Sequence, residues 1–478
     1  MKKDLRSIRI SPLISAALFI GIFALLAVRS WEAVLLPVLG HEDGRDMFAF
    51  YFNNSSPCYI LRYYAGYVSI LTNAIGWAAM RLPLPASPYV FTLASLVSAT
   101  LGFYLLSRDE HAWLIPDACT RIIIVVALAI LPLGQGYLVN NLAYSQWSLF
   151  FILIVLLSRW PLPSSIGGLS AYAVAVVLCA ATHPLSILTV PLCVGQFVLN
   201  RHRSQRVVIA FCVCTIVAYQ AIGVQHSINV TPSLHSVLWA MKVFLARVSF
   251  ESVFGARATT LLTAHGVGAY YVYAFGIMIL CMIASMVLTS ERQKRDAYIA
   301  GAMLLLAFAV VMISTMVRYV GPEIKWIHLK EPGIQRYIYI PKIIFTIMIL
   351  WQIVPRIQGT LRSQNVISRL AFLAACCVYV IAIIASNRFL YREPQAEGHR
   401  VQEFIYSVFA DLRRAKHGEP YQSRHVLDRG GPWDIVIMLH DGIGDSETFN
   451  KGIESDSRQR DGQSRRSFPL PNRTERSP

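Results

Sequence analysis

Long apolar runs separated by short polar turns dominate the chain. A helix that crosses the roughly 30 Å hydrocarbon core of a bilayer needs about 20 residues, and most of the runs approach this length. We therefore predict an all-α polytopic membrane protein with about 11 transmembrane helices. The runs lie at residues 10–29, 88–107, 120–138, 146–158, 165–181, 184–199, 206–224, 267–289, 297–317, 338–354 and 369–386.

The run at residues 63–82 has a weaker apolar pattern than the others. Arg81 interrupts it, and Pro83 and Pro85 follow it. Its Tyr and Trp side chains suit the depth at which the bilayer meets water. We therefore predict an interfacial helix here, within a first outer loop that covers residues 32–87.

Basic residues orient the spans, because cytoplasmic turns carry an excess of Lys and Arg. Lys and Arg side chains precede the first run, so we expect a cytoplasmic amino terminus. Alternation from there places the turns at 200–206, 290–295 and 356–369 inside, and all three are basic. A full span at 63–82 would move these turns outside, which favours the interfacial helix. By the same alternation the long connections lie outside, at residues 32–87, 225–266 and 318–337.

The chain after residue 386 is more polar than the rest. Residues 401–416 place apolar side chains on one helical face, and residues 433–439 form a short apolar run after Gly and Pro, which predicts a strand. Residues 441–478 are charged and Ser-rich, so we expect disorder there. The sequence thus predicts a transmembrane domain over 1–386, a small α/β-like segment over 387–440 and a disordered tail. An odd number of spans places the carboxyl terminus outside the cytoplasm.

Composition and charge agree with a membrane location. Of the 478 residues, 55% are hydrophobic and 15% are charged, whereas soluble domains carry about 25% charged residues. The net charge of +16 comes from clusters between apolar runs, so it reports orientation and not a nucleic-acid surface. Most of the nine cysteines lie in or beside apolar runs, so no disulfide framework is implied.

The stretch 40–67 carries the most distinctive chemistry. Glu42, Asp43 and Asp46 follow the first span, where acidic side chains near hydrocarbon more often mark a working site than a packing solution. Two carboxylates close together push the pKa of one upward, which suits a general base. Asp43 and Asp46 could instead bind Mg²⁺ or Mn²⁺ together with substrate phosphate. The structural alternative is a hydrated loop that caps the next helix.

Two arginines in the same stretch are candidates for substrate binding. A guanidinium group binds phosphate through two parallel hydrogen bonds, so Arg45 and Arg62 are suited to it, and Tyr64 would offer a sugar a flat surface. Arg62 could equally be an interfacial anchor. Asn140 and Asn141 lie in a polar and aromatic cluster that suits a carbohydrate, although amides at a span end also terminate helices.

A second basic cluster precedes the run at 338–354. Arg336 is expected just above the outer membrane face, where it could meet a lipid-linked phosphate with Tyr337 beside it and Lys342 in support. The alternative is a salt-bridged loop with tyrosines of the aromatic belt. His183, in a short outer turn, is more typical of a helix cap than of a catalyst. No phosphate-loop, HExxH, GxSxG or CxxC pattern occurs, which argues against nucleotide, zinc or serine hydrolases.

Several short segments together resemble a known superfamily. The chain has an inside amino terminus, a first span that leads directly into an acidic outer loop, and about eleven spans in all. This layout resembles the GT-C superfamily of polytopic membrane glycosyltransferases. More narrowly, the chain is similar to a group of bacterial membrane proteins with EDG and PYAGY-like segments. The similar segments are EDG at 42–44, LRYYAGYVSIL at 61–71, NNLAYSQW at 140–147, QRYIYIP at 335–341 and GGPWDIVI at 430–437.

The resemblance implies a function for the acidic loop. It implies transfer of a sugar from a polyprenyl-phosphate donor to a glycan, lipid or protein acceptor, on the outer face of the bacterial cytoplasmic (inner) membrane. Asp43 would be the general base, with Glu42 as the second choice and Asp46 as an orienting or metal-binding partner. Arg336 would stabilise the phosphate leaving group, where negative charge grows. Arg62 stands where related chains often have Pro.

Two other classes of membrane protein remain open. A lipid transporter or polysaccharide flippase would carry charged residues inside several spans, and the predicted spans contain almost none. A polymerase that joins lipid-linked units, as in O-antigen assembly, would use the same outer cavity but would depend more on paired arginines.

Overall fold

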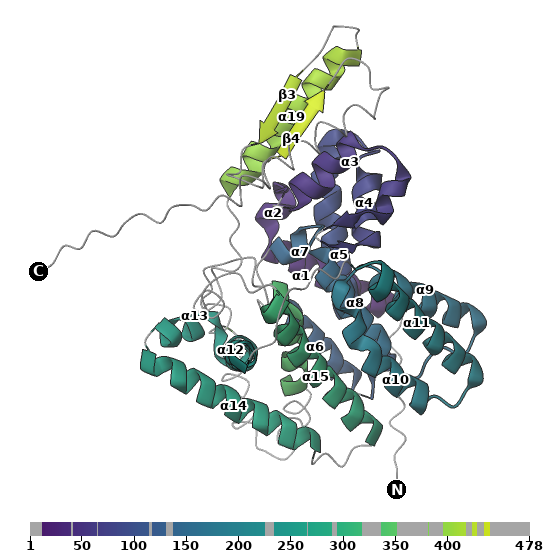
Figure 1. Ribbon diagram of the computed structural model, residues 1–478, viewed down its shortest axis with the longest axis vertical. Helices are drawn as coiled ribbons and strands as arrows, with labels where there is room; N and C mark the ends of the chain where they lie inside the picture. The colour runs from purple at the N-terminus through teal and green to yellow at the C-terminus, as the bar shows by residue number, and fades with distance from the viewer. Residues whose placement is uncertain are drawn as a thin grey trace, which may run out of the picture.

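The computed structural model consists mainly of helices, with two short β-hairpins (Figure 1). It describes residues 12–39, 42–64, 66–113, 117–130, 137–224, 234–264, 266–288, 294–317, 336–350, 381, 395–416, 423–427 and 435–439. One large buried apolar cluster joins the helices of the membrane domain with the carboxyl-terminal elements.

Five helices are long and apolar enough to cross a membrane, by their length and composition. They are α1 (Pro12–Arg29), α5 (Ser87–Leu106), α11 (Arg203–Ile222), α14 (Gly266–Leu288) and α15 (Lys294–Val317). Each coincides with a predicted span, so an apolar, mainly helical membrane protein is confirmed. The count of eleven spans is not confirmed.

Other predicted spans form shorter helices in the structure. The short apolar helices are α6 (Ala118–Ile130), α8 (Ser145–Ser158), α9 (Ile166–Ala180) and α10 (Val190–Leu199), the last preceded by the 3₁₀ helix η5 (Pro184–Thr189). A further helix occupies residues 336–350, and the predicted span at 369–386 lies largely outside the described residues. All 14 residues of α8 are buried, which explains why this helix is apolar on every side. It packs against α5, α9 and α10 at the centre of the bundle.

Residues 32–87, the predicted first outer loop, fold into several short elements. They are α2 (Trp31–Leu35), the π-helix η1 (Asp43–Ala49), α3 (Phe50–Asn53), η2 (Pro57–Leu61), the strands β1 (Tyr63–Tyr64) and β2 (Tyr67–Val68), and α4 (Ile70–Ala79). The helix predicted at 63–82 is therefore present only from Ile70 to Ala79, and its place at the membrane interface stays a prediction. The residues before it form a hairpin whose turn contains Gly66 at φ 88°, in the left-handed region that glycine tolerates.

Helices also fill most of the predicted outer connection at 225–266. These are α12 (Leu234–Val243), the π-helix η6 (Phe244–Phe250) and α13 (Glu251–Ala264), with a kink at Gly255. They pack against α14 and α15 at one side of the bundle (Figure 1).

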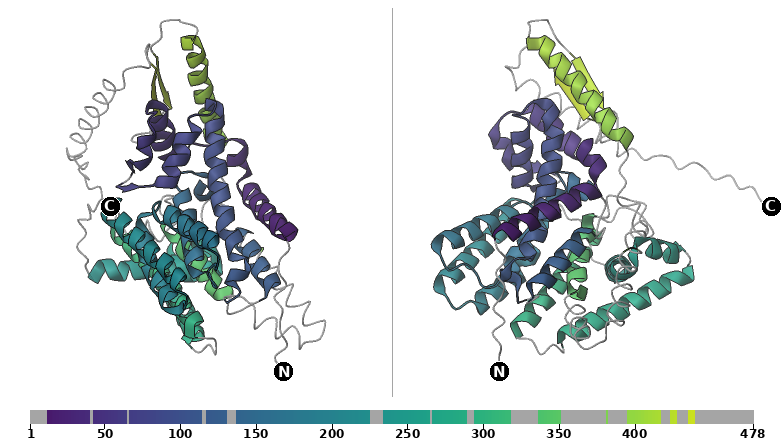
Figure 2. Two further views of the ribbon diagram at one scale, coloured as in Figure 1. Left: turned by 90° about the vertical axis from the view of Figure 1, so that its right-hand side faces the viewer. Right: turned by 180° about the vertical axis from the view of Figure 1, so that it is seen from behind.

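The carboxyl-terminal elements form a small unit beside the first outer loop (Figures 1 and 2). Helix α19 (Gln395–Lys416) and strand β4 (Ile435–Leu439) confirm the predicted helix and strand. Strand β3 (Ser423–Leu427), which was not predicted, pairs with β4 in antiparallel fashion. The unit contacts η1, α2, α3 and the 3₁₀ helix η3 (Leu84–Ala86). The tail predicted at 441–478 lies outside the described residues.

Candidate functional site

An ion pair joins the acidic loop to the helix at 336–350. Nη1 of Arg336 donates a hydrogen bond of 2.9 Å to Oε1 of Glu42, across 294 residues of sequence. Both side chains are largely buried, with 20% of Arg336 and 9% of Glu42 exposed. The other carboxylate oxygen, Oε2 of Glu42, is also buried and has no hydrogen bond within the described part of the chain. One oxygen of Glu42 is thus held by a cation, while the other has no partner among the described residues.

Aromatic side chains surround this ion pair. The guanidinium carbon of Arg336 lies 5.0 Å from the ring centroids of both Tyr144 and Tyr337. Nη2 of Arg336 donates to the Tyr337 hydroxyl at 3.1 Å. The ring of Trp147 lies edge-on to Tyr337, with centroids 5.6 Å apart. The site is therefore a charged pair surrounded by aromatic side chains, which strengthens its electrostatics by excluding water.

Two further donors near the ion pair lack hydrogen bonds. Nε of Arg336 and Nε1 of Trp147 are buried, and neither has a partner among the described residues. Buried polar groups are nearly always satisfied, so each exception calls for an explanation. Oε2 of Glu42, Nε of Arg336 and Nε1 of Trp147 are thus three buried polar atoms around the ion pair without a hydrogen-bond partner among the described residues.

Tyr67 extends the site and was not singled out by the sequence. Its hydroxyl donates to Oε1 of Gln146 at 2.6 Å. Burial raises the pKa of Tyr67 to about 12, although the hydrogen bond with Gln146 and the charge of Arg336 act in the opposite direction. The hydroxyl therefore stays protonated and acts as a donor. The sequence feature that could have identified Tyr67 is its position directly after Gly66, the glycine of the hairpin turn.

Asp43 has a different role from its neighbour Glu42. Its two carboxylate oxygens accept hydrogen bonds from the backbone amides of Leu142 and Ala143, at 2.8 and 2.7 Å. Only 1% of the residue is exposed. These amides lie between the short helix α7 (Tyr137–Asn140) and α8. Asp43 thus anchors the acidic loop to the start of the central helix, and the geometry favours Glu42 over Asp43 as a base.

Asp46 pairs with its neighbour Arg45. Nε and Nη2 of Arg45 donate to the carboxylate of Asp46 at 2.8 to 3.1 Å. Burial raises the pKa of Asp46, and the hydrogen bond and charge of Arg45 oppose that shift. Arg45 is accordingly directed at Asp46 in this conformation.

Arg62 stabilises the acidic loop through contacts with Asp46, Tyr51 and Phe50. It donates to the backbone oxygen of Asp46, and its Nε donates to the Tyr51 hydroxyl at 3.4 Å. Its guanidinium carbon lies 3.5 Å from the ring centroid of Phe50. Tyr64 lies in β1, paired with Tyr67. The structure therefore gives Arg62 a bracing role within the loop.

The two asparagines lie between helices, with Asn140 ending α7 and Asn141 following it, before α8 begins at Ser145. Oδ1 of Asn141 accepts from the Tyr144 amide at 3.0 Å, and Oδ1 of Asn140 accepts from the Ser30 hydroxyl at 3.2 Å. Both side chains are buried. The Asn141 oxygen thus caps the start of α8, whereas the Asn140 oxygen links the end of α7 to Ser30 after α1.

His183 caps a helix, as the sequence favoured. Its Nδ1 accepts from the amide of Leu185 at 3.1 Å, and its ring stacks on Phe150 with centroids 4.5 Å apart. Burial lowers the pKa of His183 to about 3, so the ring is neutral at physiological pH.

The predicted metal site at Asp43 and Asp46 does not fit the observed contacts. Both oxygens of each carboxylate already accept hydrogen bonds from N–H groups. Within the described residues no three His, Cys, Asp or Glu side chains are grouped to hold a metal ion.

Arg247, Glu251 and Lys342 form a second buried charge cluster, which the sequence analysis did not predict. Nε of Arg247 donates to Oε2 of Glu251 at 2.5 Å, and Nζ of Lys342 donates to the other oxygen. All three side chains are at most 3% exposed. Lys342, expected to assist Arg336, thus pairs with Glu251 instead. The sequence feature that could have predicted the Arg247–Glu251 ion pair is their spacing of four residues on a helix.

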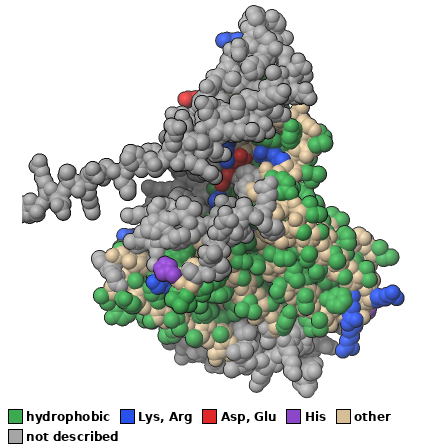
Figure 3. All heavy atoms as spheres, viewed as in Figure 1, with side chains coloured by type: hydrophobic (Ala, Val, Ile, Leu, Met, Phe, Trp, Pro, Cys, Tyr) green, Lys and Arg blue, Asp and Glu red, His purple; other side chains and the backbone are tan. Residues whose placement is uncertain are grey.

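The surface agrees with this arrangement. Figure 3 shows a mainly hydrophobic lower half, while acidic and basic side chains gather in a hollow above it, beneath the carboxyl-terminal unit.

No known protein-family profile matches the chain, and a search of curated proteins finds no match.

Proposed function

We propose that the chain is a GT-C type glycosyltransferase that moves a sugar from a polyprenyl-phosphate donor to an acceptor hydroxyl. The observation that carries the proposal is the Glu42–Arg336 pair, in which Oε2 of Glu42 and Nε of Arg336 are buried without hydrogen bonds in the described part of the chain. A glycosyl transfer to a hydroxyl needs a base for the acceptor and a cation for the phosphate leaving group. The pair supplies both in one pocket.

The reaction follows from these roles. Oε2 of Glu42 takes the proton of the acceptor hydroxyl while the acceptor oxygen attacks the anomeric carbon of the sugar. The bond between that carbon and the donor phosphate oxygen breaks, and the electron pair stays on the phosphate. Arg336 stabilises the negative charge that develops there, because a fixed cation in a water-poor site needs no reorganisation.

Neighbouring side chains suit a carbohydrate. Tyr144, Tyr337 and Trp147 provide flat apolar faces, and Tyr67 with Gln146 adds a fixed polar contact. Binding sites for small molecules commonly combine aromatic walls with a few placed polar groups. Asp43 positions Glu42 by holding the loop to α8.

The proposal includes a location and partners. The donor would reach the pocket from the bilayer, and the acceptor, a glycan, a lipid or a protein, from the outer side of the bacterial cytoplasmic membrane. The amino terminus would be cytoplasmic and the carboxyl terminus extracytoplasmic, following the distribution of basic turns.

A transporter is the second candidate, and one observation favours it. Arg247, Glu251 and Lys342 form a buried charge cluster, with Lys342 inside a predicted span. Charged groups at membrane depth often mark a transport path. A flippase would move the lipid-linked sugar across the bilayer without breaking the bond to phosphate.

The test is Glu42→Gln in membranes supplied with a labelled polyprenyl-phosphate sugar. Gln keeps an oxygen for Arg336 but is not a base, so we expect transfer to fall by about 10²–10⁴-fold. Glu403→Gln, which changes an exposed acid on α19, is the matched control and should retain full activity. Full activity in Glu42→Gln would refute the assignment of the base, and translocation of intact donor without transfer would identify a transporter.

A further inference from the structure

A pocket lies between α1 and the end of α5, and its lining shares no residue with the Glu42–Arg336 pair. It has a volume of about 610 Å³, within the range of small-molecule sites. Its walls come from the first turns of α1, with Ala16, Phe19 and Ile20, and from the end of α5, with Tyr104. Ile20 is 65% exposed on a helix apolar enough to cross the membrane, so the pocket faces lipid.

The polar groups of this pocket gather at one end. Nη1 of Arg108 donates to the Ser15 hydroxyl at 2.8 Å and to the Tyr104 hydroxyl at 3.2 Å. Ser15 lies in the first turn of α1, and Arg108 follows the last turn of α5, so the two antiparallel spans end together here. The apolar walls formed by Phe19 and Ile20 lie one to two turns further along the span, toward the hydrocarbon core.

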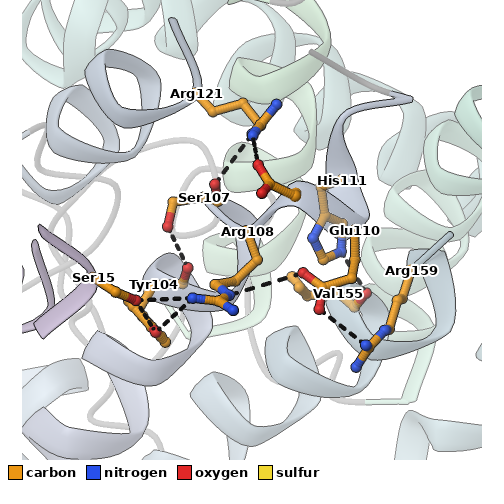
Figure 4. Close-up of polar contacts among 10 residues, drawn as sticks. Ser15, Tyr104, Ser107, Arg108, Glu110, His111, Arg121, Val155 and Arg159 are labelled. Atoms are coloured by element: carbon orange, nitrogen blue, oxygen red, sulfur yellow. Dashed lines mark hydrogen bonds and ion pairs between the residues drawn. The ribbon is translucent and has the colours of Figure 1, made fainter. Parts of the chain in front are cut away.

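The neighbouring arginines are already matched by carboxylates, as Figure 4 shows for this end of α5. Arg121 forms an ion pair with Asp109, and Nη2 of Arg159 lies 2.9 Å from Oε1 of Glu110. Asp117 adds to the negative field around Arg121.

Arg108 differs from both of these arginines. Its hydrogen bonds go to hydroxyl groups, and its nearest carboxylate oxygen among the described residues, on Glu110, is 3.9 Å away. Its side chain is 39% exposed. Since Arg159 holds Glu110 more closely, Arg108 offers the least neutralised positive charge of the three to the pocket.

We propose that this pocket binds an anionic phospholipid of the bilayer, with its headgroup phosphate on Arg108 and Ser15 and an acyl chain along Phe19 and Ile20. An amphiphile matches the arrangement because the cation and hydroxyls lie at the membrane surface and the apolar walls extend inward. Basic pockets between spans are suited to anionic headgroups, and each Arg near the surface adds to the attraction. The lipid would occupy the leaflet on the side of the amino terminus.

The experiment measures lipid retained by the full chain in a mild zwitterionic detergent by native mass spectrometry, with phosphatidylglycerol or phosphatidylcholine added. We expect the wild-type protein to retain phosphatidylglycerol in preference to phosphatidylcholine. Arg108→Gln should lower the retained phosphatidylglycerol about fivefold, as expected for the loss of one surface cation. Arg203→Gln, at an exposed arginine that begins α11, should have no effect.

A second pair of variants tests the acyl-chain wall while leaving Arg108 intact. Ala16→Trp fills the pocket and should displace the lipid, whereas Ala17→Trp, at the exposed next residue outside the pocket lining, should not. Equal retention in Ala16→Trp and Ala17→Trp, or equal retention of the two lipids by the wild type, would overturn the proposal. So would a wild-type protein that holds inorganic phosphate but no phosphatidylglycerol. None of these outcomes depends on whether the protein transfers sugars.

Discussion

Adjacent acids in the first outer loop have opposite surroundings. Asp43 is enclosed by backbone amides at 2.7 and 2.8 Å, whereas Glu42 keeps an oxygen without a hydrogen bond in the described structure. A carboxylate that accepts two amide bonds is well suited to hold a loop, and one with an unsatisfied oxygen is suited to react. The two residues therefore differ in what their substitution should change.

We expect Asp43→Asn to lower the thermal stability of the protein in detergent. An Asn side chain can accept only through its oxygen, so one of the two amides of Leu142 and Ala143 would face an NH₂ group. An unsatisfied buried donor costs about 1–3 kcal/mol. The melting temperature should fall clearly more than in Glu42→Gln, which keeps an acceptor for Arg336. Equal melting temperatures in the two variants would contradict the anchoring role of Asp43.

Sequence reasoning singled out the acidic loop but did not predict how the contacts divide between its carboxylates. It placed Glu42, Asp43 and Arg336 on one side of the membrane, and the structure shows Glu42 and Arg336 in contact. It ranked Asp43 first as the base because the resemblance pointed there. The amides that occupy Asp43 lie about a hundred residues away in the chain, and no local pattern reports such a contact.

At the scale of elements, the carboxyl-terminal unit covers the acidic loop. Ile435 of β4 is fully buried, and a methyl group added at Gly44 would overlap its Cδ1 and lie 2.7 Å from its Cγ1. Phe48 of η1 and Phe404 of α19 lie with ring centroids 6.5 Å apart. Glycine beside Asp43 thus allows β4 to pack closely on the loop.

Gly44→Ala should loosen this contact. Overpacking of a well-packed core typically costs about 1–3 kcal/mol, and here the strain falls between the loop and β4. We expect faster cleavage of the carboxyl-terminal unit in limited proteolysis. Adding Ile435→Ala should restore part of the protection by making room for the methyl group. Gly21→Ala, where nothing lies within 4 Å, should behave as wild type, and equal cleavage in Gly44→Ala would contradict the contact.

Regular elements were predictable where the hydrophobic period was long and uninterrupted. Helices α1, α5, α14 and α15 match the predicted runs closely because burial and lipid contact both favour apolar residues there. The hairpin before Ile70 was missed, since two strands of two residues leave no alternating pattern to detect. Strand β3 was missed because its sequence, SRHVL, is only partly apolar and its stability comes from pairing with β4.

At the scale of the whole molecule, the contacts of the carboxyl-terminal unit indicate on which side of the membrane it lies relative to the acidic loop. The sequence placed the carboxyl-terminal segment outside by counting spans, an argument that one extra span would reverse. The structure places α19 and β4 against the first outer loop, which is independent of that count. The two parts must therefore share one side of the membrane, whichever side that is.

Thiol labelling in intact cells tests both the shared side and its orientation. Cys58 lies exposed in η2, and Glu403 lies exposed on α19. A membrane-impermeant maleimide should therefore label Cys58 in the wild-type protein. It should label Glu403→Cys, made in a Cys58→Ser background, from the same side of the membrane. The basic turn before α11 is expected inside, so Arg203→Cys should label only after the membrane is made permeable. Labelling of the Cys58→Ser protein alone gives the background from the other cysteines.

Cys58 and Glu403→Cys labelling from opposite sides would contradict the fold, because their elements belong to regions in direct contact. Labelling of Arg203→Cys in intact cells would leave the fold intact but reverse the orientation, and with it the side on which the Glu42–Arg336 pair would meet its substrates.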